Sequence, residues 1–179
     1  MTVRRDVRKL ADQGLAAVVH GGVVGVTELL TPVDFSFRSH HYMGAKRAIA
    51  DYSVSLLREG SIVGFDAGST VLEVARRLPA NMHCTVVTHS LPVMALLARR
   101  AGVELVGLGG VLRPEAQEFA GPLALRSLAQ LRIQTLLLAT AAVRDGQMWT
   151  TNGADAEMKQ AEKGQKNPKK KRPLLPSAR

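Results

Sequence analysis

Short apolar runs alternate with amphipathic segments along most of this chain of 179 residues. The apolar runs are rich in aliphatic or β-branched residues and predict four buried strands, at 61–64, 84–88, 104–108 and 135–140. The segments around them carry apolar residues at helical spacing and predict four helices, at 46–57, 71–78, 93–100 and 123–131. Strands that alternate with helices in this way form a parallel sheet. The pattern therefore predicts an α/β fold with a Rossmann-like parallel sheet flanked by helices.

The first residues follow a different pattern. Residues 2–13 predict a helix with a strongly basic side, and residues 15–24 predict a β-hairpin with a glycine turn. A basic helix followed by a hairpin is how the DNA-facing half of a winged helix-turn-helix begins. The alternative for the helix alone is a solvated amphipathic helix with scattered arginines.

Glycine and small polar residues follow each predicted strand, at 66–70, 88–90, 109–110 and 139–141. The carboxyl ends of parallel strands lie at one edge of the sheet, where ligands bind in open α/β folds. Gly68 lets the backbone approach a ligand, and the hydroxyls of Ser69 and Thr70 lie where a new helix exposes N–H groups. Alone, this turn is more typical of an ordinary βα turn with Ser69 or Thr70 as N-cap. Its position beside the other three turns favours a phosphate pocket.

Composition and charge narrow the possible functions. The net charge is +9, but eight Lys/Arg and one acidic residue lie in 159–179, which leaves +2 for the rest of the chain. Charge alone therefore does not predict DNA binding by the globular part.

There is no apolar run of about 18 residues and no signal-peptide pattern, so we expect no membrane association. The single Cys84 fits a reducing cytoplasm. For His40 and His41 we expect solvated loop positions rather than a metal site.

The N-terminal pattern resembles the recognition helix and wing of DeoR-family transcriptional regulators. The likeness rests on the run Thr2-Val3-Arg4-Arg5-Asp6-Val7, on Leu10 and Gly14, and on Val19-His20-Gly21-Gly22. It implies DNA contacts by Thr2, Arg4, Arg5, Arg8 and His20. The chain begins inside the recognition helix, so we expect the preceding helices to be absent, through a misplaced start or a truncation, and DNA binding to be weakened.

The remaining motifs resemble the sensor domain of the same family, whose fold is related to sugar-phosphate isomerases and CoA-transferases. They are Asp66-Ala67-Gly68-Ser69-Thr70, Thr88-His89-Ser90, Gly109-Gly110-Val111-Leu112-Arg113 and Phe119-Ala120-Gly121-Pro122. His89 stands where the family has an asparagine, and Ala141-Ala142 where a glycine is common. The resemblance implies a phosphorylated sugar effector bound by Lys46, Asp66, Gly68, Ser69, Thr70, Thr88, Ser90, Gly109 and Gly110.

This interpretation divides the chain into four parts. They are a partial winged helix-turn-helix at 1–25, a linker at 26–45, an effector-sensing domain incomplete at its C-terminal end at 46–160, and a basic disordered tail at 161–179. We expect a cytoplasmic homo-oligomer with DNA and a phosphorylated sugar as partners, and with neither a cofactor nor a metal ion.

The leading hypothesis is a transcriptional regulator, in particular a repressor, of sugar metabolism rather than an enzyme. One alternative is a sugar-phosphate isomerase or deaminase on the same fold. Such chemistry needs a general base above the sugar, for which Asp66, Glu115 and Glu118 are the available carboxylates. The other alternative is a non-functional truncated remnant.

Overall fold

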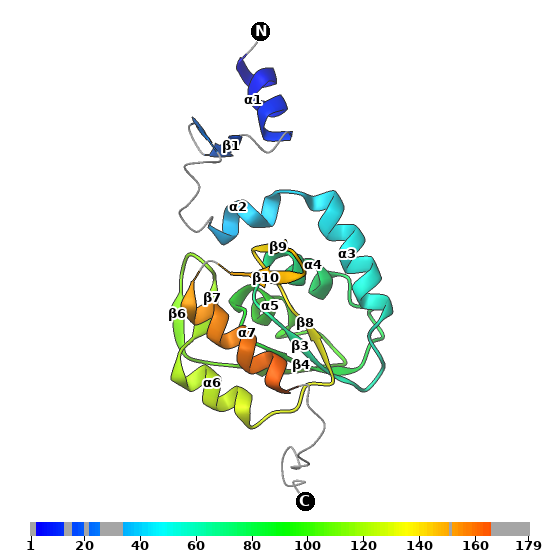
Figure 1. Cartoon of the computed structure of the whole chain (residues 1–179). Coiled ribbons are helices and arrows are strands. Elements are labelled where there is room, and N and C mark those ends of the chain that lie inside the picture. The colour runs from blue at the N-terminus through cyan, green and yellow to red at the C-terminus, as the bar shows by residue number, and fades with distance from the viewer. Residues whose placement is uncertain (1–2, 13–15, 20–21, 26–33, 151, 166–179) are drawn as a thin grey trace, which may run out of the picture. The chain divides into compact units, whose positions relative to one another are not determined.

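The computed structural model describes residues 3–12, 16–19, 22–25, 34–150 and 152–165. The chain divides into two compact units, Met1–His41 and Tyr42–Arg179 (Figure 1). The predicted sites Thr2 and His20, and residues 166–179 of the predicted disordered tail, lie outside the described residues. Residues 161–165 of that predicted tail are helical instead, as the end of helix α7 (Gly153–Gln165). In the part of the chain that is described, no helix has the length and apolar character to cross a membrane.

The first unit contains the predicted helix and hairpin. Helix α1 spans Val3–Asp12, and strands β1 (Ala16–Val19) and β2 (Gly22–Gly25) pair antiparallel. A further helix, α2 (Phe35–His40), is capped by the Asp34 side chain, which accepts a hydrogen bond from the Ser36 N–H. This helix lies within the segment predicted as a linker, where a run of only six residues shows no helical periodicity.

The second unit is built on a parallel sheet of β3 (Ile62–Phe65), β4 (Cys84–Thr88), β5 (Val103–Gly107) and β8 (Thr135–Leu137), in the order β5-β4-β3-β8. The predicted parallel α/β sheet is confirmed. Strand β8 ends at Leu137 rather than at residue 140, because the backbone beyond it turns its N–H groups to other partners. The central strands β3 and β4 are the most deeply buried, as expected for apolar runs covered on both faces.

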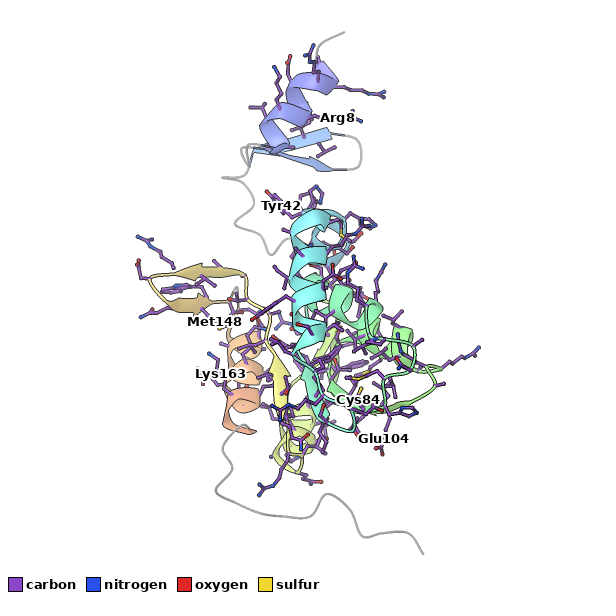
Figure 2. All side chains as sticks on the ribbon, turned by 90° about the vertical axis from the view of Figure 1, so that its right-hand side faces the viewer. Arg8, Tyr42, Cys84, Glu104, Met148 and Lys163 are labelled. Carbon is purple, nitrogen blue, oxygen red and sulfur yellow. The ribbon has the colours of Figure 1, made fainter. Side chains whose placement is uncertain are left out.

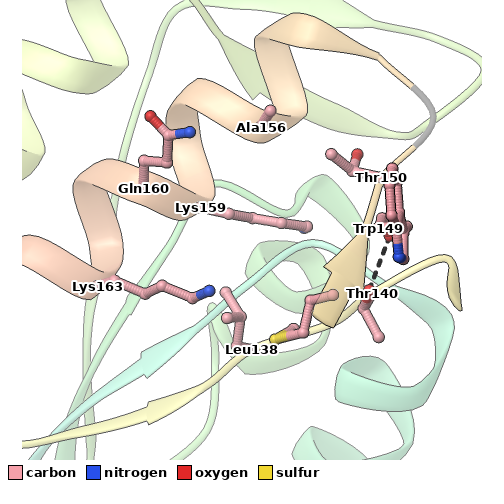
Figure 3. Close-up of a pocket in the computed structure, with 9 residues that line it drawn as sticks. Leu138, Thr140, Trp149, Thr150, Ala156, Lys159, Gln160 and Lys163 are labelled. Atoms are coloured by element: carbon pink, nitrogen blue, oxygen red, sulfur yellow. Dashed lines mark hydrogen bonds between the residues drawn. The ribbon is translucent and has the colours of Figure 1, made fainter. Parts of the chain in front are cut away.

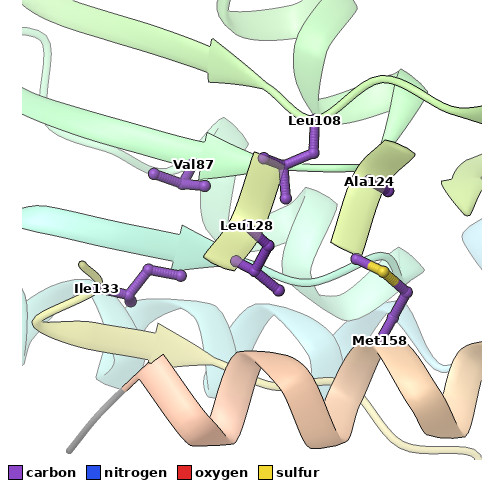
Figure 4. Packing of buried hydrophobic residues seen from close by; sticks show 6 residues of the cluster. All are labelled: Val87, Leu108, Ala124, Leu128, Ile133 and Met158. Carbon is purple, nitrogen blue, oxygen red and sulfur yellow. The ribbon is translucent and has the colours of Figure 1, made fainter. Parts of the chain in front are cut away.

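Helices cover both faces of this sheet (Figure 2). On one side α3 (Met43–Ser55) packs against α4 (Ser69–Arg76), and α4 packs against α5 (Leu91–Leu97). On the other side α6 (Pro122–Ala129) packs against α7 (Gly153–Gln165). Figure 4 shows the core beneath α6 and α7, which is formed by Val87, Leu108, Ala124, Leu128, Ile133 and Met158.

Two hairpins were not predicted, because three-residue strands carry too little alternation to be recognised. Strands β6 (Val111–Arg113) and β7 (Glu118–Ala120) form one hairpin, and β9 (Ala142–Arg144) and β10 (Gln147–Trp149) form the other. The first hairpin also contacts the segment after β4: the Phe119 N–H donates to the His89 carbonyl, and Ser90 bridges to Glu118. It therefore fixes the chain immediately beyond the carboxyl end of β4.

Candidate functional site

The strand register brings the predicted ligand turns to one edge of the sheet. Phe65 pairs with Thr88 on one side and with Leu137 on the other, and Thr88 pairs in turn with Gly107. The turns that follow these strands therefore emerge together, as predicted. The strand order reverses between β3 and β8, because β4 and β5 lie on one side of β3 and β8 on the other. Such a switch point is the usual position of a ligand crevice.

Helix α4 begins at this switch point. Gly68 is its N-cap, and the side chains of Ser69 and Thr70 are half-buried in its first turn. A Cβ atom on Gly68 would lie 2.7 Å from the Ala139 Cβ atom, so only glycine allows the turn to approach the end of β8. The unpaired N–H groups and the dipole of a helix start favour an anion.

Asp66 holds this turn in place through contacts with other parts of the chain. Its side chain is fully buried. One carboxylate oxygen, Oδ1, accepts the Ala67 N–H at 2.7 Å, and the other, Oδ2, accepts the Ala139 N–H at 2.8 Å and contacts the Lys159 amine at 2.7 Å. Asp66 could either bind a sugar hydroxyl or orient the turn, and the geometry supports orientation of the turn.

The other predicted effector residues differ in accessibility. Thr88 is fully buried, and its hydroxyl donates to the Phe65 carbonyl, so it ties β4 to β3. Ser90 is fully buried as well, whereas Gly109 is exposed. Gly110 has a φ of +149° and lies against the Ala120 backbone. Lys46 is buried in α3, which packs against α4. Most of these residues therefore lie at the sheet edge, but the buried side chains among them contact other parts of the protein and stabilise the fold.

A buried ionic cluster lies behind the turn, where α7 reaches the sheet edge. The Nε2 atom of His89 lies 3.5 Å from Oδ1 of Asp66, and its Nδ1 atom lies 3.4 Å from Oε1 of Glu162. Lys159 contacts Asp155 at 2.6 Å as well as Asp66. Glu118 in β7 is also buried. His89 thus places an ionisable ring inside this cluster.

Burial and charge act against each other on these groups. Burial lowers the pKa of His89, but its contact with Glu162 and the charges of Asp66 and Glu118 outweigh this, so the pKa lies above its usual value. Burial also lowers the pKa of Lys159, and Asp66 and Asp155 more than reverse that effect. Burial raises the pKa of both Glu118 and Glu162. Lys159 is therefore a charged partner for Asp66 near neutral pH.

A hollow of about 120 Å³ opens beside the cluster, at the end of β8 (Figure 3). It lies between α7 and the β9–β10 hairpin, and the Thr140 hydroxyl donates to the Trp149 carbonyl at its rim. Figure 3 shows Lys159 and Lys163 extending from α7 across it, with Lys163 pointing towards Leu138. The lining combines an aromatic ring, aliphatic groups and amines: Leu138, Thr140, Met148, Trp149, Thr150, Ala156, Lys159, Gln160 and Lys163.

Sequence reasoning did not assign Lys159, Glu162 or Trp149 to the site. Asp155 and Lys159 stand four residues apart on a recognisable helix, a spacing that indicates an ion pair on one face. For Glu162 and Trp149 the sequence offers no such signal, because their position depends on how α7 and the hairpin pack. His40 and His41 end α2, where the Nδ1 atom of each lies in hydrogen-bond range of a helix carbonyl.

The predicted DNA-contacting arginines lie on one helix of the first unit. Arg4, Arg5 and Arg8 are all exposed on α1, which packs against β1. Val3 and Leu10 of the same helix are also exposed within the described part of this unit. The arrangement offers three guanidinium groups to a partner, and their contacts with DNA stay a prediction.

Two family models match the chain. The DeoR C terminal sensor domain matches residues 42–165, and the DeoR-like helix-turn-helix domain matches residues 1–28. The boundary between the two models agrees with the division of the structure after His41.

Curated relatives carry the same resemblance. The chain is 36% identical over 160 residues to the HTH-type transcriptional regulator GlpR of Haloferax volcanii, covering 89% of this chain and 62% of the relative. It is 34% identical over 159 residues to the L-fucose operon activator of Haemophilus influenzae, covering 88% and 64% respectively. The chain is 32% identical over 142 residues to the transcriptional repressor AccR of Agrobacterium fabrum, covering 79% of this chain and 55% of the relative. The chain thus spans about three fifths of the length of these relatives, and it belongs to the DeoR family.

Proposed function

We propose that this protein is a DNA-binding transcriptional regulator of carbohydrate metabolism, acting as a repressor in the cytoplasm, whose sensor unit binds a phosphorylated sugar. The observation that carries the proposal is the α4 N-terminus at the switch point between β3 and β8. The same chain thus carries an anion site at that point and, in its first unit, a basic helix, α1. Relatives described as an L-fucose operon activator and a lactose phosphotransferase system repressor support the connection with sugars.

In this proposal the phosphate binds the N–H groups of Gly68, Ser69 and Thr70 and the hydroxyls beside them. The side chains of Asp66 and Thr88 act indirectly, because both are committed to backbone groups. The hollow at the end of β8 is smaller than the roughly 300 Å³ of most whole small-molecule sites, so it takes part of the sugar. Lys163 is exposed there and supplies a positive charge.

A direct test compares Ser69→Asp with the unmodified chain by calorimetry and thermal shift, using hexose, pentose and triose phosphates. An acidic residue in the first turn stabilises a helix but repels phosphate, so affinity falls by about tenfold or more while the fold is kept. Ser127→Asp, at an exposed position of α6, is the matched control and retains affinity. Equal affinity in all three proteins, or no response to any phosphate, contradicts the proposal.

Effector and DNA binding should be coupled, since regulators shift between states that bind DNA differently. We expect steeply salt-dependent binding to promoter fragments, weakened by Arg5→Ala and changed about 5-fold or more by the effector. The control Arg144→Ala removes an exposed arginine of β9 and leaves DNA binding unchanged. Homo-oligomerisation, which we also propose, is measured on the same samples by light scattering. Turnover of a sugar phosphate would instead support the isomerase or deaminase alternative.

A further inference from the structure

Three side chains with metal-binding atoms meet in the interior of the second unit. Asp66 follows β3, His89 follows β4, and Glu162 lies in α7. One donor atom from each residue lies within 4.8 Å of the others, and none of the three side chains is more than 2% exposed. The residues come from three separate elements, so their convergence is a product of the fold rather than of local sequence.

Several atoms of this cluster lack a hydrogen-bond partner among the described residues. Within the described residues, neither ring nitrogen of His89 has a hydrogen bond, and the Oε2 atom of Glu162 has none either. The contacts of 3.4 and 3.5 Å to the two carboxylates are longer than good hydrogen bonds. Buried polar atoms nearly always have a partner, because leaving one unsatisfied is costly. The imidazole therefore points to a ligand that the protein atoms do not supply.

Charge around the cluster favours a cation. The carboxyl groups of Asp66, Asp155, Glu118 and Glu162 are opposed by Lys159, by Arg113 and, when its ring is protonated, by His89, whose pKa lies above its usual value. Lys159 contacts the Oδ2 atom of Asp66, and the Oδ1 atom, which accepts the Ala67 N–H, also lies 3.5 Å from the Nε2 atom of His89. A divalent ion that replaced the proton on the imidazole would balance the excess of negative groups and would bind the ring nitrogen at the same time.

We propose that Asp66, His89 and Glu162 bind a divalent transition-metal ion. One imidazole nitrogen and two carboxylate oxygens form a donor set used for Zn²⁺, Mn²⁺, Fe²⁺ and Co²⁺. Two ligands about 2.1 Å from a tetrahedral ion lie about 3.4 Å apart, close to the 3.5 Å between His89 Nε2 and Asp66 Oδ1. Glu162 contacts the other ring nitrogen, Nδ1, at 3.4 Å, so its side chain has to turn its unpaired Oε2 atom towards the ion to complete the set. Lys159, which contacts Asp66, also lines the hollow beside β8.

The test uses the full chain, freed of metal with a chelator and titrated with Co²⁺ and then Zn²⁺. We expect one ion per chain, with a visible Co²⁺ absorption band that Zn²⁺ removes, and a higher melting temperature with either ion. Replacement of one ligand, in His89→Asn or Glu162→Gln, weakens binding by about tenfold or more. The matched controls are His83→Asn and Glu59→Gln, which alter an exposed His–Glu pair in contact at 2.9 Å and leave binding unchanged.

Absence of saturable binding of either ion overturns the proposal, as does binding that persists in His89→Asn and Glu162→Gln or disappears in His83→Asn. Circular dichroism shows whether the variants fold. If they do not fold, X-ray absorption spectroscopy of the unmodified chain with Zn²⁺ identifies the ligands of the ion and so still tests the proposal. One imidazole with oxygen ligands supports the site, whereas a sulfur ligand or several imidazoles contradict it. The proposal stands or falls independently of effector binding, because the effector experiment uses no metal.

Discussion

The amine of Lys159 lies 2.7 Å from the Oδ2 atom of Asp66, although 93 residues separate the two in the chain. The contact joins α7 to the turn after β3. The same carboxylate oxygen accepts the Ala139 N–H, so one buried group connects β3, β8 and α7 at the switch point. Because α7 also lines the hollow at the end of β8, the relationship links the proposed anion site at α4 to the wall of that hollow.

Removal of this charge should destabilise the second unit. Asp66→Asn replaces an acceptor oxygen by a donor and leaves Lys159 with Asp155 alone, so we expect a loss of about 3 kcal/mol in the free energy of unfolding. The measurement is urea denaturation followed by circular dichroism. Asp51→Asn is the control, because Asp51 pairs with Arg77 at an exposed position and should contribute less than about 1 kcal/mol. Similar losses in the two variants would contradict the role assigned to Asp66.

Gly68 should tolerate no side chain while Ala139 is present. A Cβ atom at Gly68 would lie 2.7 Å from the Ala139 Cβ atom, so Gly68→Ala should cost about 1–3 kcal/mol and weaken effector binding by displacing the α4 N-terminus. The double variant Gly68→Ala/Ala139→Gly removes the clash and should regain most of both losses. A double variant no better than the single one would show that the contact is not the cause.

The adjacent glycines 109 and 110 should respond differently to alanine. Gly110 has a φ of +149°, and an added Cβ atom would lie 2.5 Å from the Ala120 carbonyl oxygen, whereas nothing lies within 4 Å of one on Gly109. We expect Gly110→Ala to lower the free energy of unfolding by about 1–3 kcal/mol and Gly109→Ala to change it by less than about 0.5 kcal/mol. Thermal denaturation of both variants tests this, and equal midpoints would count against the close approach of β6 and β7.

Cys84 should be inert in the folded protein. Its thiol lies in β4, and burial raises its pKa, so little of it is the reactive thiolate at neutral pH. Labelling with a thiol reagent should be slow for the native chain and fast in concentrated urea. Because Cys84 is the only cysteine, the rate reports on this residue alone. Fast labelling without denaturant would mean that β4 opens readily.

The sequence alone determined the sheet and its ligand edge. Aliphatic runs followed by glycine and small polar residues indicated where β3, β4 and β5 end to within one residue, and parallel strands place such ends together. The motifs within 2–22, 66–70, 88–90, 109–113 and 119–122 together indicated the family. These features are local, since each depends on residues adjacent in the chain.

Tertiary structure decided which side chains face a ligand. Asp66 and Thr88 look like ligand contacts in sequence, but strands packed on both sides turn their oxygens to backbone partners. Lys159 and Glu162 enter the site only because α6 and the core around Met158 hold α7 against the sheet edge. Sequence patterns describe the faces of one element at a time. The orientation of a turn depends on groups that packing supplies from elsewhere in the chain, as Lys159 does for Asp66.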